Sequence, residues 1–70
     1  MTKEINAEEA QTIAGRFLRQ QGYLVGEVIS VIRRGYAYSV KIGVKQTDWP
    51  FNYVPKSVRI DLEGNILGVR

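Results

Sequence analysis

The sequence predicts an α+β domain, in which one N-terminal helix packs on an antiparallel meander of three long strands and a short fourth (α-β-β-β-β). Two observations predict this fold class. Apolar residues recur with helical spacing between Ile5 and Gly22. The rest of the chain alternates with the period of β-strands and is interrupted by turn residues. Seventy residues are enough for a single small domain, 1–70.

The helix is predicted from its spacing and from the signals at both ends. Asn6 is a favourable N-cap, and Glu9 stands three residues later, where its side chain can reach back to the Asn6 amide. Gly22 can adopt the left-handed conformation that ends a helix. The apolar face is expected to consist of Ala10, Ile13, Ala14, Phe17 and Leu18.

The first two strands are predicted at about Glu27 to Arg33 and at Tyr36 to Lys45, joined by a turn at Arg34-Gly35. The second strand alternates cleanly. The residues expected to face the helix are Tyr36, Tyr38, Val40, Ile42 and Val44. Those expected to face water are Ala37, Ser39, Lys41, Gly43 and Lys45.

The register of this first hairpin has two alternatives. A two-residue loop at Arg34-Gly35 places Ile29 and Val31 on the same face as Tyr38 and Val40. A three-residue loop that includes Arg33 places Val28, Ser30 and Ile32 there instead, because a slip of one residue exchanges the faces. The first register is preferred, since it buries two branched aliphatic side chains and exposes the serine.

The third strand is predicted from about Asn52 to Asp61, with Pro55 at an edge, at a bulge or near the start of the paired region. Residues 61–64 fit a three-residue hairpin loop that contains a left-handed glycine, and Ile66 to Val69 return as the short fourth strand. The predicted core consists of Ile13, Ala14, Phe17, Tyr38, Val40, Ile42, Val58 and Ile60.

Composition argues against an enzyme. The sequence has no cysteine and no histidine, and therefore lacks the usual general base and the commonest metal ligands. We expect no catalytic residues, no cofactor and no metal site. The longest apolar run is too short for a membrane span, and the first residues lack the charged-then-apolar layout expected of a signal peptide. A cytoplasmic location is expected, or an extracytoplasmic one if the chain is an excised domain.

Two groups of residues are candidates for binding a partner. The first is an aromatic group in and after the irregular segment between the second and third strands: Trp49, Pro50, Phe51 and Tyr53. The second is a basic group predicted on the outward face of the sheet and at the hairpin tip: Arg33, Arg34, Lys41, Lys45 and Arg59. The first group predicts a protein partner, and the second is the alternative, a nucleic-acid interface. Tyr36 and Tyr38 are predicted to point inward, which argues against base stacking on the basic face.

The order of these signals resembles a PepSY domain, a family found in peptidase propeptides and bacterial envelope proteins. The opening Ile5-Asn6-Ala7-Glu8-Glu9-Ala10 with Ile13-Ala14, the strand Tyr36-Ala37-Tyr38-Ser39-Val40 and the closing hairpin 58–67 are similar to that family's phrases. The tail, which ends in Gly68-Val69-Arg70, is also similar to the closing strands of a gas-vesicle accessory family.

The PepSY resemblance implies a small non-catalytic protein-binding or inhibitory module, and it carries no site residues over. The sequence thus leads us to expect another protein as the partner, with nucleic acid as the alternative. The molecule itself is expected to be a monomer or a weak homodimer, because a meander leaves open strand edges.

Overall fold

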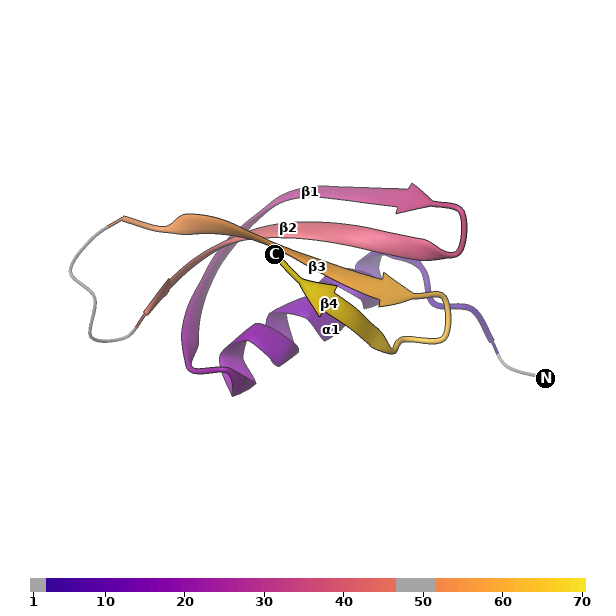
Figure 1. Cartoon of the computed structure of the whole chain (residues 1–70), viewed down its shortest axis with the longest axis horizontal. Helices are drawn as coiled ribbons and strands as arrows, with labels where there is room; N and C mark the ends of the chain where they lie inside the picture. The colour runs from indigo at the N-terminus through magenta and orange to yellow at the C-terminus, as the bar shows by residue number, and fades with distance from the viewer. Residues whose placement is uncertain (1–2, 47–51) are drawn as a thin grey trace.

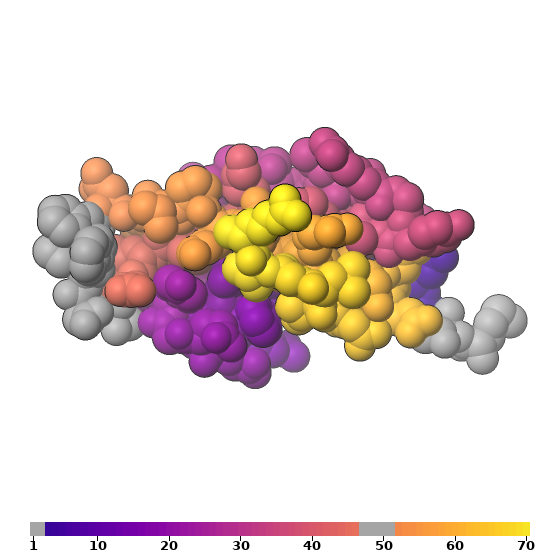
Figure 2. All heavy atoms as spheres, viewed as in Figure 1, coloured from indigo at the N-terminus to yellow at the C-terminus, as the bar shows by residue number. Residues whose placement is uncertain are grey.

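The structure is a computed structural model that describes residues 3–46 and 52–70. One helix, α1 (Ala7–Gln20), precedes four strands: β1 (Tyr23–Arg34), β2 (Ala37–Gln46), β3 (Val54–Asp61) and β4 (Ile66–Val69). The strands form a single antiparallel sheet in the order β1-β2-β3-β4. Figure 1 shows α1 lying along one side of this sheet, and the same two layers are visible in the space-filling view of Figure 2. The predicted fold class is confirmed.

The ends of α1 are formed as the sequence predicts. The Asn6 side chain accepts a hydrogen bond from the Glu9 amide at 2.8 Å, and the Asn6 amide donates to Glu9 Oε1 at 3.1 Å. This reciprocal pair is a capping box, which satisfies two amides that the helix itself leaves free. At the other end, Gly22 has φ 93° and turns the chain into β1.

The hairpin between β1 and β2 turns one residue later than predicted. Arg34 pairs with Ala37, so the two-residue loop is Gly35-Tyr36. Gly35 has φ 57° at the first loop position, where a type II′ turn requires a positive φ. The prediction that Tyr36 faces the helix is therefore wrong: its side chain stands at the tip of the hairpin and is 87% exposed.

The pairing of β1 with β2 is regular near the turn and irregular at two places farther from it. Val31 lies opposite Val40, as the preferred register requires for its face, and Ser30 lies opposite Lys41 on the other face. The pairing then shifts between Ser30 and Val28 and again between Val28 and Val25. These shifts break the two-residue alternation. The prediction that Ile29 is buried is wrong, because Ile29 lies at the first shift and is 57% exposed.

Strand boundaries differ modestly from those predicted. β1 begins at Tyr23 rather than Glu27, and β3 begins at Val54 rather than Asn52. Pro55 lies next to the start of β3, opposite Gly43, which is one of the expected places for a proline in a paired strand.

The core lies between α1 and the facing side of the sheet. Six of the predicted core residues are buried: Ala14, Tyr38, Val40, Ile42, Val58 and Ile60. Ile13 and Phe17 contact this core from partly buried positions. Leu18 is fully buried and is one of the largest side chains in the core, together with residues such as Ile42 and Ile60. Leu18 is thus the largest fully buried side chain of the helix, whereas Phe17 is only partly buried.

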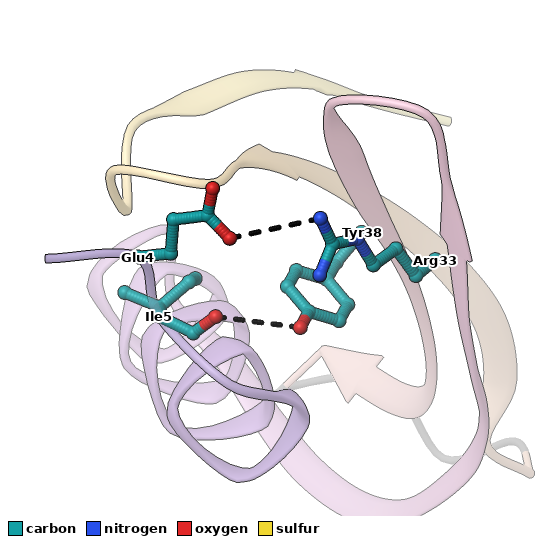
Figure 3. Close-up of polar contacts among 4 residues, drawn as sticks. All are labelled: Glu4, Ile5, Arg33 and Tyr38. Carbon is teal, nitrogen blue, oxygen red and sulfur yellow. Dashed lines mark hydrogen bonds and ion pairs between the residues drawn. The ribbon is translucent and has the colours of Figure 1, made fainter.

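The segment before α1 fastens the helix to the hairpin ends (Figure 3). The Ile5 amide donates to the Leu62 carbonyl at 2.8 Å, and the Tyr38 hydroxyl donates to the Ile5 carbonyl at 3.3 Å. Arg33 and Glu4 approach to 3.6 Å, with the Arg33 guanidinium 5.9 Å from the centre of the Tyr38 ring. These contacts hold the helix on one face of the sheet, and within residues 3–46 and 52–70 no other helix lies over the opposite face.

Candidate functional site

The face of the sheet opposite α1, hereafter the open face, carries a group of polar side chains on neighbouring strands. Cross-strand pairing aligns them in rows: Ser39 lies opposite Arg59, and Lys41 lies between Ser30 and Ser57. Backbone hydrogen bonds in both directions between Ser57 and Arg70 extend the second row beyond β4. We call this group the donor patch, and it consists of Ser30, Arg34, Ser39, Lys41, Ser57, Arg59 and Arg70.

The donor patch lines a shallow hollow of about 440 Å³ in the surface of the sheet. Ala37, Ile32 and Tyr38 complete its lining. Ala37 was predicted to face water, but it is only 8% exposed, since it forms part of the hollow's floor. Ile32 is 45% exposed and gives the hollow an apolar side.

The donors of the patch are not used by the protein itself. Within residues 3–46 and 52–70, none of the seven side chains takes part in a side-chain hydrogen bond or an ion pair. No Asp or Glu side chain of the described residues lines the hollow. Such an array of cations and hydroxyls attracts an anion, because every side chain can donate a hydrogen bond and four of them are positively charged.

Asp61 is an acidic residue at the edge of the donor patch, paired with Ala37 across the strands. Its carboxylate is hydrogen-bonded within the β3–β4 turn. Its carboxylate accepts hydrogen bonds from the Glu63 amide at 2.9 Å, from the Asn65 amide at 2.8 Å and from the Asn65 side chain at 3.0 Å. These bonds, those from Asn65 first, hold the pKa of Asp61 below its ordinary value. The turn thus supplies hydrogen-bond partners to this carboxylate, and within the described residues it forms no ion pair with the cations of the donor patch.

The other end of the open face is partly covered by Tyr53. A Cβ added to Gly26 would lie 3.0 Å from Tyr53 Cε1, and one added to Gly43 would lie 3.6 Å from Tyr53 Cβ. The Tyr53 ring therefore packs where the two strands have no side chains, and it buries Gly43, which was expected to face water. Lys45 Nζ lies 5.8 Å from the centre of the same ring.

The predicted basic group is divided by the structure. Arg34, Lys41 and Arg59 come together in the donor patch, whereas Lys45 lies beside Tyr53. Arg33 contacts Glu4 and the Tyr38 ring on the helix side of the hairpin. Of the predicted aromatic group, Tyr53 directly precedes β3, packs on the sheet and is 52% exposed. Trp49, Pro50 and Phe51 lie outside the described residues.

Sequence reasoning missed Arg70 and the three serines. Arg70 joins the patch because the β3–β4 hairpin returns it to a position beside Ser57. The alternation of β2 and β3 placed Ser39 and Ser57 on the outward face, but only the pairing of the strands shows which cation each serine accompanies.

A second hollow lies at the end of the sheet near Tyr23. Residues from β1, β2 and β3 line it, among them Tyr23, Lys45, Val54 and Lys56. Lys56 Nζ lies 5.8 Å from the centre of the Tyr23 ring, so this cation already has an aromatic partner. The donor patch, whose cations have no such partner among the described residues, is the stronger candidate site.

The described part of the chain contains no group of three or more His, Cys, Asp or Glu side chains that could hold a metal ion. In the same part of the chain, no helix is long and apolar enough to cross a membrane. Comparison with protein-family models, with curated proteins and with solved structures finds no match.

Proposed function

We propose that this protein is a small non-catalytic module that binds an acidic segment of a partner protein on the donor patch. The observation that carries this proposal is the composition of the patch: four cationic and three hydroxyl side chains share one face, and no Asp or Glu side chain of the described residues lines the hollow between them. Complementary charge accelerates association and selects partners of the opposite sign. The resemblance to PepSY domains supports the same kind of binding or inhibitory role.

The side chains around the cations favour a protein partner over nucleic acid, because they include an apolar residue but no exposed aromatic ring. Binding of single-stranded nucleic acid usually combines basic residues with exposed aromatic rings on which bases stack. Tyr36 lies at the hairpin tip and Tyr53 at the other end of the sheet, so neither ring lines the patch. Tyr38 borders the hollow, but it is only 7% exposed and its hydroxyl donates to the Ile5 carbonyl on the helix side, so its ring offers no surface for stacking. Ile32 instead offers the patch an apolar contact, which suits a peptide with both acidic and apolar side chains.

The proposal is tested with a short poly-glutamate peptide whose binding is measured by calorimetry at low and at physiological salt. The double variant Lys41→Glu/Arg59→Glu should weaken binding at least about tenfold, because it replaces two attractive charges by repulsive ones. Lys3→Glu/Arg16→Glu is the matched control: it changes the net charge equally, but these exposed residues lie before and on α1. The control should alter binding less than about threefold, which is what long-range attraction alone allows at a distance comparable to the Debye length.

An oligo-dT of equal charge serves as the competing ligand under the same conditions. Tighter binding of the oligonucleotide, lost in the Lys41→Glu/Arg59→Glu variant, would replace the acidic protein segment by nucleic acid. Absence of binding to either probe at low salt would contradict a binding role for the patch.

A further inference from the structure

We infer that the centre of the donor patch is a phosphate-binding site that receives a phosphorylated serine or threonine of the partner. This inference rests on the proposed function and specifies the group that is recognised. The residues concerned form what we call the central cluster: Ser39, Lys41, Ser57 and Arg59. They belong to two neighbouring strands, β2 and β3.

The register of the two strands alternates hydroxyls and cations around the central cluster. Ser39 lies opposite Arg59, and Lys41 lies opposite Ser57. Directly opposed Cβ atoms in an antiparallel sheet are about 5 Å apart, and diagonal neighbours are about 7–8 Å apart. The two cations therefore occupy one diagonal and the two hydroxyls the other, all on the same side of the sheet.

The lengths of the side chains complement this arrangement. Ser39 and Ser57 are partly buried, with short side chains fixed close to the strands, whereas Lys41 and Arg59 are exposed and long. The hydroxyls can thus donate from below to an anion, while the ammonium and guanidinium groups close over it from two sides. Arg59 can also donate two parallel hydrogen bonds to a pair of phosphate oxygens.

The charge of the central cluster fits a dianion better than a carboxylate. Lys41 and Arg59 are like charges on adjacent strands, and no acidic residue lines the hollow between them. Such neighbours repel each other, and a bound anion relieves this repulsion. A phosphate monoester brings a charge of about −1.5 to −2 at pH 7 and three acceptor oxygens, enough for both cations and a hydroxyl. A single carboxylate brings one charge and two oxygens.

The surroundings favour a phosphorylated peptide over a free phosphate ion. Arg34 and Arg70 lie in the same hollow on the outer strands, where they can contact acidic residues on either side of a phosphorylated residue. Ile32 lies opposite Ser39 and next to the cluster, where it can contact an apolar side chain of the same peptide. A free ion uses none of these contacts.

The experiment compares three acidic peptides that differ at one central position, which is phosphoserine, glutamate or serine. Binding to the full chain is measured by calorimetry at pH 7.5. We expect the phosphoserine peptide to bind at least about tenfold more tightly than the glutamate peptide. This preference should diminish below about pH 6, where the phosphate takes up its second proton.

Variants distinguish the central cluster from the rest of the patch. Ser39→Ala/Ser57→Ala should reduce the phosphoserine-to-glutamate preference to below about threefold, because the phosphate loses the hydroxyl donors beneath its additional oxygen. Ser30→Ala is the matched control, because Ser30 lines the same hollow on β1 outside the cluster, and it should leave the preference intact. Circular dichroism of each variant establishes that the sheet is retained.

The outcomes separate this inference from the proposed function. Equal binding of the phosphoserine and glutamate peptides would overturn the phosphate site but leave acidic-peptide binding in place. Failure of all three peptides to bind would contradict the proposed function itself. Inorganic phosphate that binds as tightly as the phosphopeptide would assign the cluster to a small free anion and overturn the peptide assignment.

Discussion

The two faces of β2 and β3 use alternate residues of the same strands for opposite purposes. Towards α1, these strands present side chains that are fully buried: Val40, Ile42, Val44, Val58 and Ile60. Towards the open face they present Ser39, Lys41, Ser57 and Arg59, for which the described residues provide no hydrogen-bond or ion-pair partner. Stability is therefore concentrated on one face, and the donors on the other remain free to bind a partner.

This separation is unusually clean because a single helix supplies the whole second layer. Within the described part of the chain, no polar or charged residue is buried in the core. Substitutions on the two faces should consequently affect different properties: unfolding free energy on the helix side, and anion binding on the open side. The following predictions test this division, beginning with the largest expected effect.

Leu18→Ala should be the most destabilising of these changes. Leu18 is fully buried between α1 and the sheet, so its truncation removes apolar burial and leaves a cavity, at a cost of about 2–5 kcal/mol in unfolding free energy. Urea titration followed by circular dichroism measures the loss. Leu67→Ala, the matched control at a 54% exposed position on β4, should cost less than about 0.5 kcal/mol. Comparable losses for the two leucines would mean that α1 does not cover the sheet as described.

Gly26→Ala should lower the stability by an intermediate amount, and it tests the packing of Tyr53 on the open face. The added Cβ would lie 3.0 and 3.1 Å from Tyr53 ring carbons and 3.2 Å from the Gly43 carbonyl oxygen, so the ring or the strand must shift. Overpacking of this kind costs about 1–3 kcal/mol. Thermal unfolding gives the comparison with Gly68→Ala, whose added Cβ meets nothing within 4 Å.

A second variant identifies the origin of that cost. If the Tyr53 ring is the main obstacle, Gly26→Ala should cost clearly less in a Tyr53→Ala background than in the native chain. An unchanged cost would assign the strain to the Gly43 carbonyl and would mean that the Tyr53 ring does not pack firmly against Gly26.

Local signals in the sequence were sufficient for the helix, the number of strands and most of the core. The Asn6–Glu9 capping box, the alternation of β2 and the glycine at position 64 each act over a few residues, so the sequence displays them directly. Gly64, with φ 95°, ends the turn as expected. Such features depend on neighbouring residues alone.

Features that depend on pairing between strands could not be read in the same way. The irregularities of β1 that expose Ile29 follow from how β1 fits β2, and sequence alternation does not encode them. The burial of Gly43 requires Tyr53 from another strand region. Arg33 and Arg34 were predicted at the hairpin tip, but the turn lies one residue later and both belong to β1, where adjacent side chains point to opposite faces: the first to Glu4 and the second to the open face. The donor patch was therefore only partly predictable.

Asp61→Asn should change the stability least of these variants. The pH dependence of that change tests whether the turn hydrogen-bonds the Asp61 carboxylate. The hydrogen bonds from Asn65 and Glu63 hold the pKa of Asp61 in the folded protein below its value in the unfolded chain. The unfolded state therefore takes up a proton first as the pH falls. The stabilisation by Asp61 is complete above the unfolded pKa of about 4 and is lost as the pH falls through the folded pKa.

Asparagine at this position cannot contribute that stabilisation at any pH. The native chain should thus be more stable than Asp61→Asn at pH 7, and the difference between their melting temperatures should shrink as the pH falls from about 5 to 2. Glu63→Gln, a charge-matched change at an exposed neighbour, should show no comparable trend. A pH-independent difference for Asp61→Asn would mean that its carboxylate is not held by the turn. It would then be free to neutralise the cations of the donor patch, and the separation of the two faces would lose its electrostatic basis.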